Sequence, residues 1–139
     1  MNYLLDTCVI SEFTRRQPDE RIIHWLDSLD EAKLFLSVIT IGEIQHGIER
    51  LPDSRRKNEL MIWLNVGLIE RFSGRILALD VPTLVLWGTL IAHLEASGQP
   101  MSVMDSLIAA SALHNNLILV TRNTADFVPC GVQLLNPWE

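Results

Sequence analysis

The sequence is poor in cysteine and has no uninterrupted apolar run of membrane-spanning length. Its two cysteines, Cys8 and Cys130, are too few for a disulfide framework, so we interpret them as reduced thiols. The longest apolar stretch, residues 76–94, does not predict a membrane span because charged, proline and glycine residues interrupt it. No basic segment precedes the first apolar run, and no signal-peptide pattern is present. These absences predict a cytoplasmic protein without a membrane segment.

Positive charge is also scarce. Eleven basic residues stand against 17 acidic ones, which gives a net charge of −6 and disfavours a nucleic-acid binder that works through bulk charge. Most of the basic residues are arginine, whose planar fork suits phosphate because it can bind two oxygens at once. The plainer interpretation of the two basic clusters is a pair of solvated surface turns. The clusters are Arg15, Arg16 and Arg21, and Arg50, Arg55, Arg56 and Lys57.

Hydrophobic residues make up 48% of the chain, which predicts one domain over residues 1–139 with a substantial core. Short apolar runs alternate with segments of helical spacing, and this alternation is typical of an α/β fold with a parallel sheet covered on both faces. We expect four or five strands, the fifth short, and a polar loop at 121–127. The expected strands are 3–5, 34–39, 76–79, 117–120 and 132–135; the expected helices are 7–16, 19–29, 40–51, 55–71, 82–96 and 103–115.

Three acids fall at hinges between these elements. Asp6 follows the first strand, whereas Glu43 and Asp105 fall in first helical turns, each three residues after a hydroxyl residue. That spacing also fits a capping box, so the acids could merely finish helix N-termini. A parallel sheet, however, brings its carboxyl strand ends to one edge, where ligands bind. Three carboxylates converging there repel one another unless a cation neutralises them, and hard oxygen ligands suit Mg²⁺ or Mn²⁺.

Such a site favours phosphodiester hydrolysis, because the ions can activate a water and stabilise the leaving oxygen. Bound cations would also let an acidic pocket accept phosphate. Asp80 ends a strand as well, but Pro82 follows closely and we interpret Asp80 as a helix cap. Thr7, beside Asp6, is placed to orient that carboxylate or the attacking water, and it also suits a helix N-cap.

The chain resembles a known family in four blocks that occur in order along its whole length. They are residues 4–10 (LLDTCVI), 37–47 (SVITIGEIQHG), 105–110 (DSLIAA) and 120–127 (VTRNTADF), and the closing LNPW at 135–138 is similar too. The family is that of PIN-domain ribonucleases, more closely the VapC-type toxins of bacterial toxin–antitoxin pairs. The resemblance implies a three-layer α/β/α sandwich with a central parallel sheet and an acidic pocket.

The resemblance also implies a metal-dependent endoribonuclease whose metal-site acids are Asp6, Glu43 and Asp105. The fourth block departs from the pattern, since Asn123 stands where some relatives have Asp. Asp126 is the nearest carboxylate, and we interpret it as the fourth acid of the site, with loop capping as its structural alternative. Family members are commonly blocked by a small antitoxin and commonly form homodimers. The RNA substrate stays open among transfer, messenger and ribosomal RNA, because a metal-site motif does not encode RNA shape.

Two other functions compete with a nuclease. One is phosphoryl transfer through an aspartyl-phosphate, which in the haloacid-dehalogenase pattern needs a second Asp two residues after the first, and Cys8 occupies that position. No Gly-rich phosphate loop is present either. The remaining alternative is a non-catalytic α/β module that binds RNA or protein and whose acids only cap helices. Sensitivity to EDTA and to the substitution Asp6→Asn separates this module from a nuclease.

Overall fold

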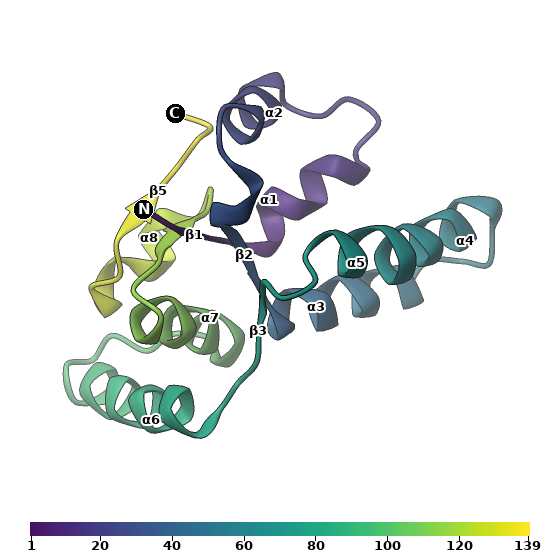
Figure 1. Cartoon of the computed structure of the whole chain (residues 1–139). Helices are drawn as coiled ribbons and strands as arrows, with labels where there is room; N and C mark the ends of the chain where they lie inside the picture. Colours follow the sequence, from purple (N-terminus) through teal and green to yellow (C-terminus); the bar gives the residue numbers. More distant parts are fainter.

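The computed structural model describes residues 1–139, and a five-stranded parallel sheet runs through its centre (Figure 1). The strand order is β3-β2-β1-β4-β5, so the first strand of the chain is the middle strand of the sheet. Each strand pairs in parallel with its neighbours, and Leu5 of β1 stands opposite Val120 of β4. The strands are β1 (Tyr3–Leu5), β2 (Leu34–Ser37), β3 (Ile76–Leu77), β4 (Ile118–Val120) and β5 (Leu134–Leu135). All five strands predicted from the sequence are present.

Helices cover both faces of the sheet, as the α/β/α prediction requires. The first face carries α1 (Thr7–Ser11), η1 (Glu12–Thr14), α2 (Glu20–Asp27), η2 (Glu31–Lys33) and α3 (Val38–Glu49), then α4 (Arg55–Ile62), the π-helical η3 (Trp63–Leu68) and α5 (Ile69–Arg71). The second face carries α6 (Val81–Ala96), α7 (Val103–His114), α8 (Thr124–Phe127) and η4 (Val128–Cys130). In Figure 1, α3 and α4 run side by side away from the sheet.

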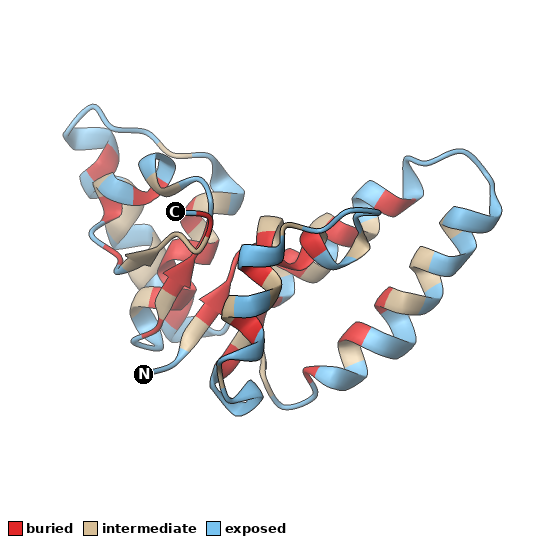
Figure 2. Cartoon of the chain, turned by 90° about the horizontal axis from the view of Figure 1, so that it is seen from above, coloured by how far each residue is buried: buried red, intermediate tan, exposed pale blue.

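The two hydrophobic cores follow from the alternation of side chains along the strands. Leu5 and Val120 point to one face, where α1, α2, α3 and η3 pack. Their neighbours Leu4 and Leu119 point to the other, where α7 and α8 pack. Figure 2 shows the buried residues gathered along the strands and on the helix faces turned toward them. None of the helices combines the length and the apolar character that a membrane crossing requires.

Two local predictions are wrong, one for the loop at 121–127 and one for the N-cap of α3. The polar loop expected at 121–127 contains the short helix α8. The helix expected over 55–71 is present, but its middle turn is π-helical. The N-cap of α3 is Ser37, whose hydroxyl accepts the backbone N–H of Ile39, and not Thr40. Thr40 is buried in the first turn of α3, so Glu43 lies one turn further along the helix than a capping box allows. Asp80 caps α6, as expected.

Candidate functional site

Asp6 follows the middle strand directly and caps α1. Its carboxylate is almost buried, with Oδ1 accepting the Thr7 backbone N–H at 2.8 Å and Oδ2 accepting the Thr121 hydroxyl at 2.8 Å. Burial raises the pKa of Asp6, the two hydrogen bonds oppose that rise, and the charges of Asp105 and Glu43 add to it. The chain thus holds a desolvated carboxylate beside two further acids, an arrangement that favours a neutralising cation.

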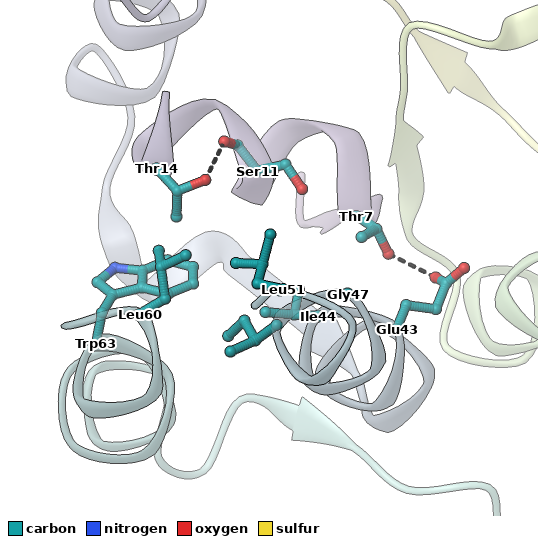
Figure 3. A pocket seen from close by; sticks show the side chains of 10 residues that line it. Thr7, Ser11, Thr14, Glu43, Ile44, Gly47, Leu51, Leu60 and Trp63 are labelled. Atoms are coloured by element: carbon teal, nitrogen blue, oxygen red, sulfur yellow. Dashed lines mark hydrogen bonds between the residues drawn. The ribbon is translucent and has the colours of Figure 1, made fainter. Parts of the chain in front are cut away.

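Glu43 reaches the same place from α3. The Thr7 hydroxyl lies 2.6 Å from Glu43 Oε1 (Figure 3). It also lies 3.1 Å from the Thr40 hydroxyl. Thr7 therefore links the two acids, since its backbone N–H bonds Asp6 and its side chain bonds Glu43. The capping explanation fails for Glu43, because Ser37 caps the helix and the carboxylate turns to Thr7 instead.

Asp105 approaches from the helix on the other face of the sheet. Its backbone N–H donates to the Ser102 hydroxyl at 3.2 Å, so Ser102 caps α7 as predicted. The Asp105 carboxylate does not bond back to Ser102, forms no ion pair, and is partly exposed. Only half of the expected capping box forms, and the carboxylate stays available to a ligand. Its charge reaches Asp6, whose pKa it raises.

Asn123 and Asp126 lie in the segment that follows β4. Both residues are exposed, and the Asn123 backbone N–H donates to the Thr121 hydroxyl at 3.0 Å. Asp126 lies in the first turn of α8, where its backbone N–H donates to the Asn123 carbonyl at 3.1 Å. Its carboxylate neither caps the loop nor pairs with a cation of the chain. The segment is therefore tied to Asp6 through Thr121, while its polar side chains face solvent.

Thr121 is a site residue that the sequence reasoning missed. It is buried, it follows β4 directly, and β4 pairs with β1, so Thr121 stands beside Asp6 across the strand ends. The Asp6 backbone N–H also donates to the Val120 carbonyl at 2.9 Å. The signal that could have found Thr121 is the one that found Asp6: a polar residue placed directly after a buried strand.

A second missed feature is the buried Glu12, only 2% exposed at the end of α1. Its Oε1 accepts the Asp19 backbone N–H at 2.8 Å and lies 3.5 Å from Arg15, while its Oε2 lies 3.8 Å from Arg122. The Arg122 guanidinium in turn lies 4.4 Å from the centre of the Trp138 ring. Arg122 follows Thr121, so these contacts anchor the segment that bonds Asp6. A lone Glu in a short helix gives no sequence signal of such a role.

A groove of about 210 Å³ opens beside Glu43 (Figure 3). Thr7 and Thr14 mark one wall, Glu43 and the apolar side of α3 form the other, and Trp63 of η3 lies at the far end. The groove therefore begins at two residues of the candidate site and leads away from them over a largely apolar floor.

This fold and this group of acids define a class of protein, and comparison with known proteins identifies it. The chain belongs to the PIN domain family, which matches residues 3–128. It is 38% identical to Toxin FitB of Neisseria gonorrhoeae, over 98% of both chains. It is 32% identical to VapC ribonuclease Y4jK of Sinorhizobium fredii, over 98% of this chain and 97% of that one. It is 27% identical to the tRNA(fMet)-specific endonuclease VapC of Shigella flexneri, over 100% and 99%.

Solved structures agree with this assignment. FitAcB from Neisseria gonorrhoeae matches with a TM-score of 0.93 and 37% identity over 99% of both chains. VapBC2 from Rickettsia felis, bound to a DNA fragment from its promoter, matches with a TM-score of 0.82 and 26% identity over 98% of both chains. The family resemblance and the PIN-like fold predicted from the sequence are confirmed.

PIN-domain ribonucleases are metal-dependent, so the fit of a cation to this chain matters. In the conformation described, no three His, Cys, Asp or Glu side chains lie close enough together to hold an ion directly. The available donors are nevertheless hard carboxylate oxygens. Burial chiefly raises the pKa of Asp6 and the charges of Asp105 and Glu43 add to the rise, and a bound cation would offset both effects. Small divalent ions keep several waters and need only one or two carboxylates. The residues therefore fit such an ion.

Proposed function

We propose that this protein is a metal-dependent endoribonuclease, the toxin of a type II toxin–antitoxin module, which hydrolyses RNA phosphodiester bonds. The observation that carries the proposal is the Asp6 carboxylate, buried at the end of the middle strand and joined to Glu43 through the backbone N–H and the hydroxyl of Thr7. Asp6 also caps α1, but capping does not account for Glu43, whose carboxylate accepts the Thr7 hydroxyl and not a helix N-terminal N–H. Relatives named as ribonucleases and as a toxin support the same activity.

Asp6, Glu43 and Asp105 would hold the ion, which we take to be Mg²⁺ with Mn²⁺ as a substitute. When bound, the ion supplies Lewis acidity that activates water and neutralises phosphodiester charge. Thr121 fixes the orientation of Asp6, and Thr7 fixes that of Glu43. Asp126 is the fourth acid of the proposal, and Asn123 would support it with a neutral carbonyl oxygen; both residues are exposed in the segment after Thr121.

The partners follow from the relatives. A FitAcB complex and a VapBC2 complex bound to promoter DNA support a cognate antitoxin protein as partner of this chain. One relative is named tRNA(fMet)-specific endonuclease, so transfer RNA is the substrate that we would test first. Exposed apolar side chains on α6 and η3 support a homodimer, among them Val81, Val85 and Val66.

The test is cleavage of total small RNA by purified protein free of antitoxin. Reactions with Mg²⁺, Mn²⁺ or EDTA are compared, and Asp6→Asn serves as the control because it keeps the shape of the side chain and removes its charge. We expect discrete fragments that vanish with EDTA and with the variant. Folded protein that binds RNA equally well in EDTA, and cleaves none under any ion, would establish the binding module instead.

A further inference from the structure

Thr121 is the last residue that the sheet holds before the chain turns away from it. Its backbone N–H donates to the Leu135 carbonyl at 3.0 Å, and its hydroxyl donates to Asp6 Oδ2 at 2.8 Å. Strand β4 ends at Val120, so strand pairing does not fix the residue that follows Thr121. The orientation of the hydroxyl therefore also depends on contacts that the chain makes beyond the sheet.

The next residue, Arg122, is held by contacts with distant parts of the chain. Its guanidinium lies 4.4 Å from the centre of the Trp138 ring, and its Nη2 lies 3.8 Å from Glu12 Oε2. The Asn136 side chain donates to the Arg122 carbonyl at 3.4 Å. The segment after β5 therefore lies against the residue that leaves the candidate site.

Trp138 is itself firmly placed, although one of its polar atoms is left unsatisfied. The residue is 6% exposed and belongs to the core that α1 and α2 cover. Arg21 of α2 donates to the Trp138 carbonyl, and the Asn136 side chain accepts the Trp138 backbone N–H at 2.9 Å. The indole Nε1 is nevertheless buried without a hydrogen-bond partner, which is costly. The position of the ring is explained by what its faces contact, and Arg122 lies on one of them.

The two oxygens of the buried Glu12 have different partners. Oε1 accepts the Asp19 backbone N–H at 2.8 Å, at the start of α2, and lies 3.5 Å from Arg15. Oε2 lies 3.8 Å from Arg122. Because a buried carboxylate is costly unless it is paired, Glu12 favours an inward position of the Arg122 guanidinium. Arg122 is thus held from two sides, by a charge and by an aromatic ring.

We propose that Arg122 and Trp138 are positioning residues of the candidate site, which hold the Thr121 hydroxyl on Asp6 and thereby raise the affinity for the divalent ion. The inference rests on the proposed nuclease function and adds residues that tune its ion site from outside. Neither side chain forms a hydrogen bond or an ion pair with Asp6, so each acts through Thr121. The alternative is that both residues only stabilise the fold.

A double-mutant cycle on Mn²⁺ affinity, measured by calorimetric titration without RNA, separates these two roles. Arg122→Gln should weaken Mn²⁺ binding about tenfold, the lower end of the loss expected for an outer-shell partner. In protein that already carries Thr121→Val, the same substitution should change the affinity by less than about twofold, because the bond that Arg122 orients is gone. Equal effects in the two backgrounds, or no effect in either, would overturn the proposal.

Arg15→Gln is the matched control for this cycle. Arg15 contacts the same Glu12 carboxylate, but it follows η1 and lines a surface hollow with Arg16 and Arg56, whereas Arg122 follows the candidate site. The control variant should bind Mn²⁺ as the unsubstituted protein does. An equal loss of affinity for Arg15→Gln and Arg122→Gln would assign the effect to Glu12 and the fold, and not to the segment after β4.

Trp138 is tested with two variants of different shape. Trp138→Phe keeps an aromatic face for Arg122 and should retain most of the Mn²⁺ affinity, whereas Trp138→Leu removes that face and should lower the affinity as Arg122→Gln does. Thermal unfolding shows whether both variants are folded. Equal losses for Phe and Leu in folded protein would remove the ring from the proposal.

Amide hydrogen exchange in metal-free protein tests the inference without an ion. The Asn123 backbone N–H donates to the Thr121 hydroxyl at 3.0 Å, so its exchange reports how well that hydroxyl is held. Arg122→Gln should speed this exchange several-fold and Arg15→Gln should not. Unchanged exchange at Asn123 in the Arg122→Gln variant would overturn the inference.

Cleavage assays separate this inference from the proposed function. If Arg122 acts through the ion site, a higher Mn²⁺ concentration should restore RNA cleavage by the folded Arg122→Gln variant. Cleavage that stays low at saturating Mn²⁺ would count against the positioning role. Absence of cleavage by the unsubstituted protein, with Mn²⁺ binding that depends on Arg122, would overturn the nuclease function and keep the positioning role.

Discussion

Asp6 and Asp105 belong to the same candidate site but are held in opposite ways. Both Asp6 oxygens accept hydrogen bonds from the chain, and the side chain is almost buried. The Asp105 carboxylate is partly exposed and bonds nothing in the chain. One half of the site is fixed by the fold, whereas the other half is left for ligands to complete. The chain therefore fixes the carboxylate at the middle strand in advance and leaves the one on α7 free to move.

The largest expected effect tests whether both halves serve the reaction. Asp6→Asn and Asp105→Asn should each reduce RNA cleavage by more than the about 10–100-fold that outer-shell changes cost, because each removes a proposed ligand. Their effects on stability should differ. Without added metal at neutral pH, Asp6→Asn should raise the free energy of unfolding by relieving a buried anion, and Asp105→Asn should leave it nearly unchanged. A cleavage assay measures the loss of activity, and unfolding in urea measures the change in the free energy of unfolding. Equal stability changes would contradict the contrast.

The next largest effect is expected for Thr121→Val, which removes a hydrogen bond to Asp6 and leaves Asp105 untouched. The variant removes the donor to Asp6 Oδ2, so it should lower Mn²⁺ affinity and cleavage by about 10–100-fold. It should also cost about 1–3 kcal/mol of stability, since a buried acceptor loses its partner. Thr121→Ser keeps the hydroxyl and serves as the control. Calorimetric titration of Mn²⁺ and thermal unfolding measure the two effects, and Val behaving like Ser in both would refute the role of this bond.

The pH dependence of stability sharpens the same comparison. The folded state raises the pKa of Asp6 above its ordinary value of 3.8, so between the two values the folded protein binds more protons than the unfolded chain. The free energy of unfolding contributed by Asp6 is therefore highest below pH 3.8, and it falls as pH rises through the raised pKa. Unfolding in urea with EDTA, for the unsubstituted protein and for Asp6→Asn, isolates this contribution as the difference between two curves. If the free energy of unfolding of the two proteins varied with pH in parallel, the folded state would not raise the pKa of Asp6.

The smallest effects are expected in the exposed segment after Thr121. Asp126→Asn should change stability by less than about 0.5 kcal/mol because the residue is exposed, and it should lower cleavage less than Asp6→Asn does. Asn123→Asp should tighten Mn²⁺ binding, because it places a negative charge where the chain has a neutral amide. Metal titrations of both variants measure this. A loss with Asp126→Asn as large as that with Asp6→Asn would place Asp126 among the principal ligands.

Sequence patterns located the strands because each strand contains a short apolar run, and a polar residue directly follows β1 and β4. The same rule located Asp6, and a second use of it at Val120 would have located Thr121. Cap positions were harder to predict. Ser37 and Thr40 both precede helical spacing, and the burial of Thr40 against Thr7, a contact over 33 residues, decided between them.

The remaining features depend on contacts between distant segments, which local patterns do not encode. Glu12 is buried because the Asp19 backbone N–H and the Arg122 side chain supply it with partners. The convergence of Arg15 and Arg16 with Arg56 depends on how α4 folds back beside η1. Composition suggested solvated turns for these arginines, and only the three-dimensional arrangement joins them.

The central position of the first strand has a consequence for the order of synthesis. The ribosome makes β1 first, yet β1 cannot complete its pairing until β4 has been made, and Asp6 gains the Thr121 hydroxyl across 115 residues of chain. Long-range parallel pairing of this kind forms late and slowly. A nascent chain therefore carries its first acid for most of translation without the neighbours that shape the pocket. The candidate site is therefore assembled only after β4 and Thr121 have been made, 115 residues after Asp6.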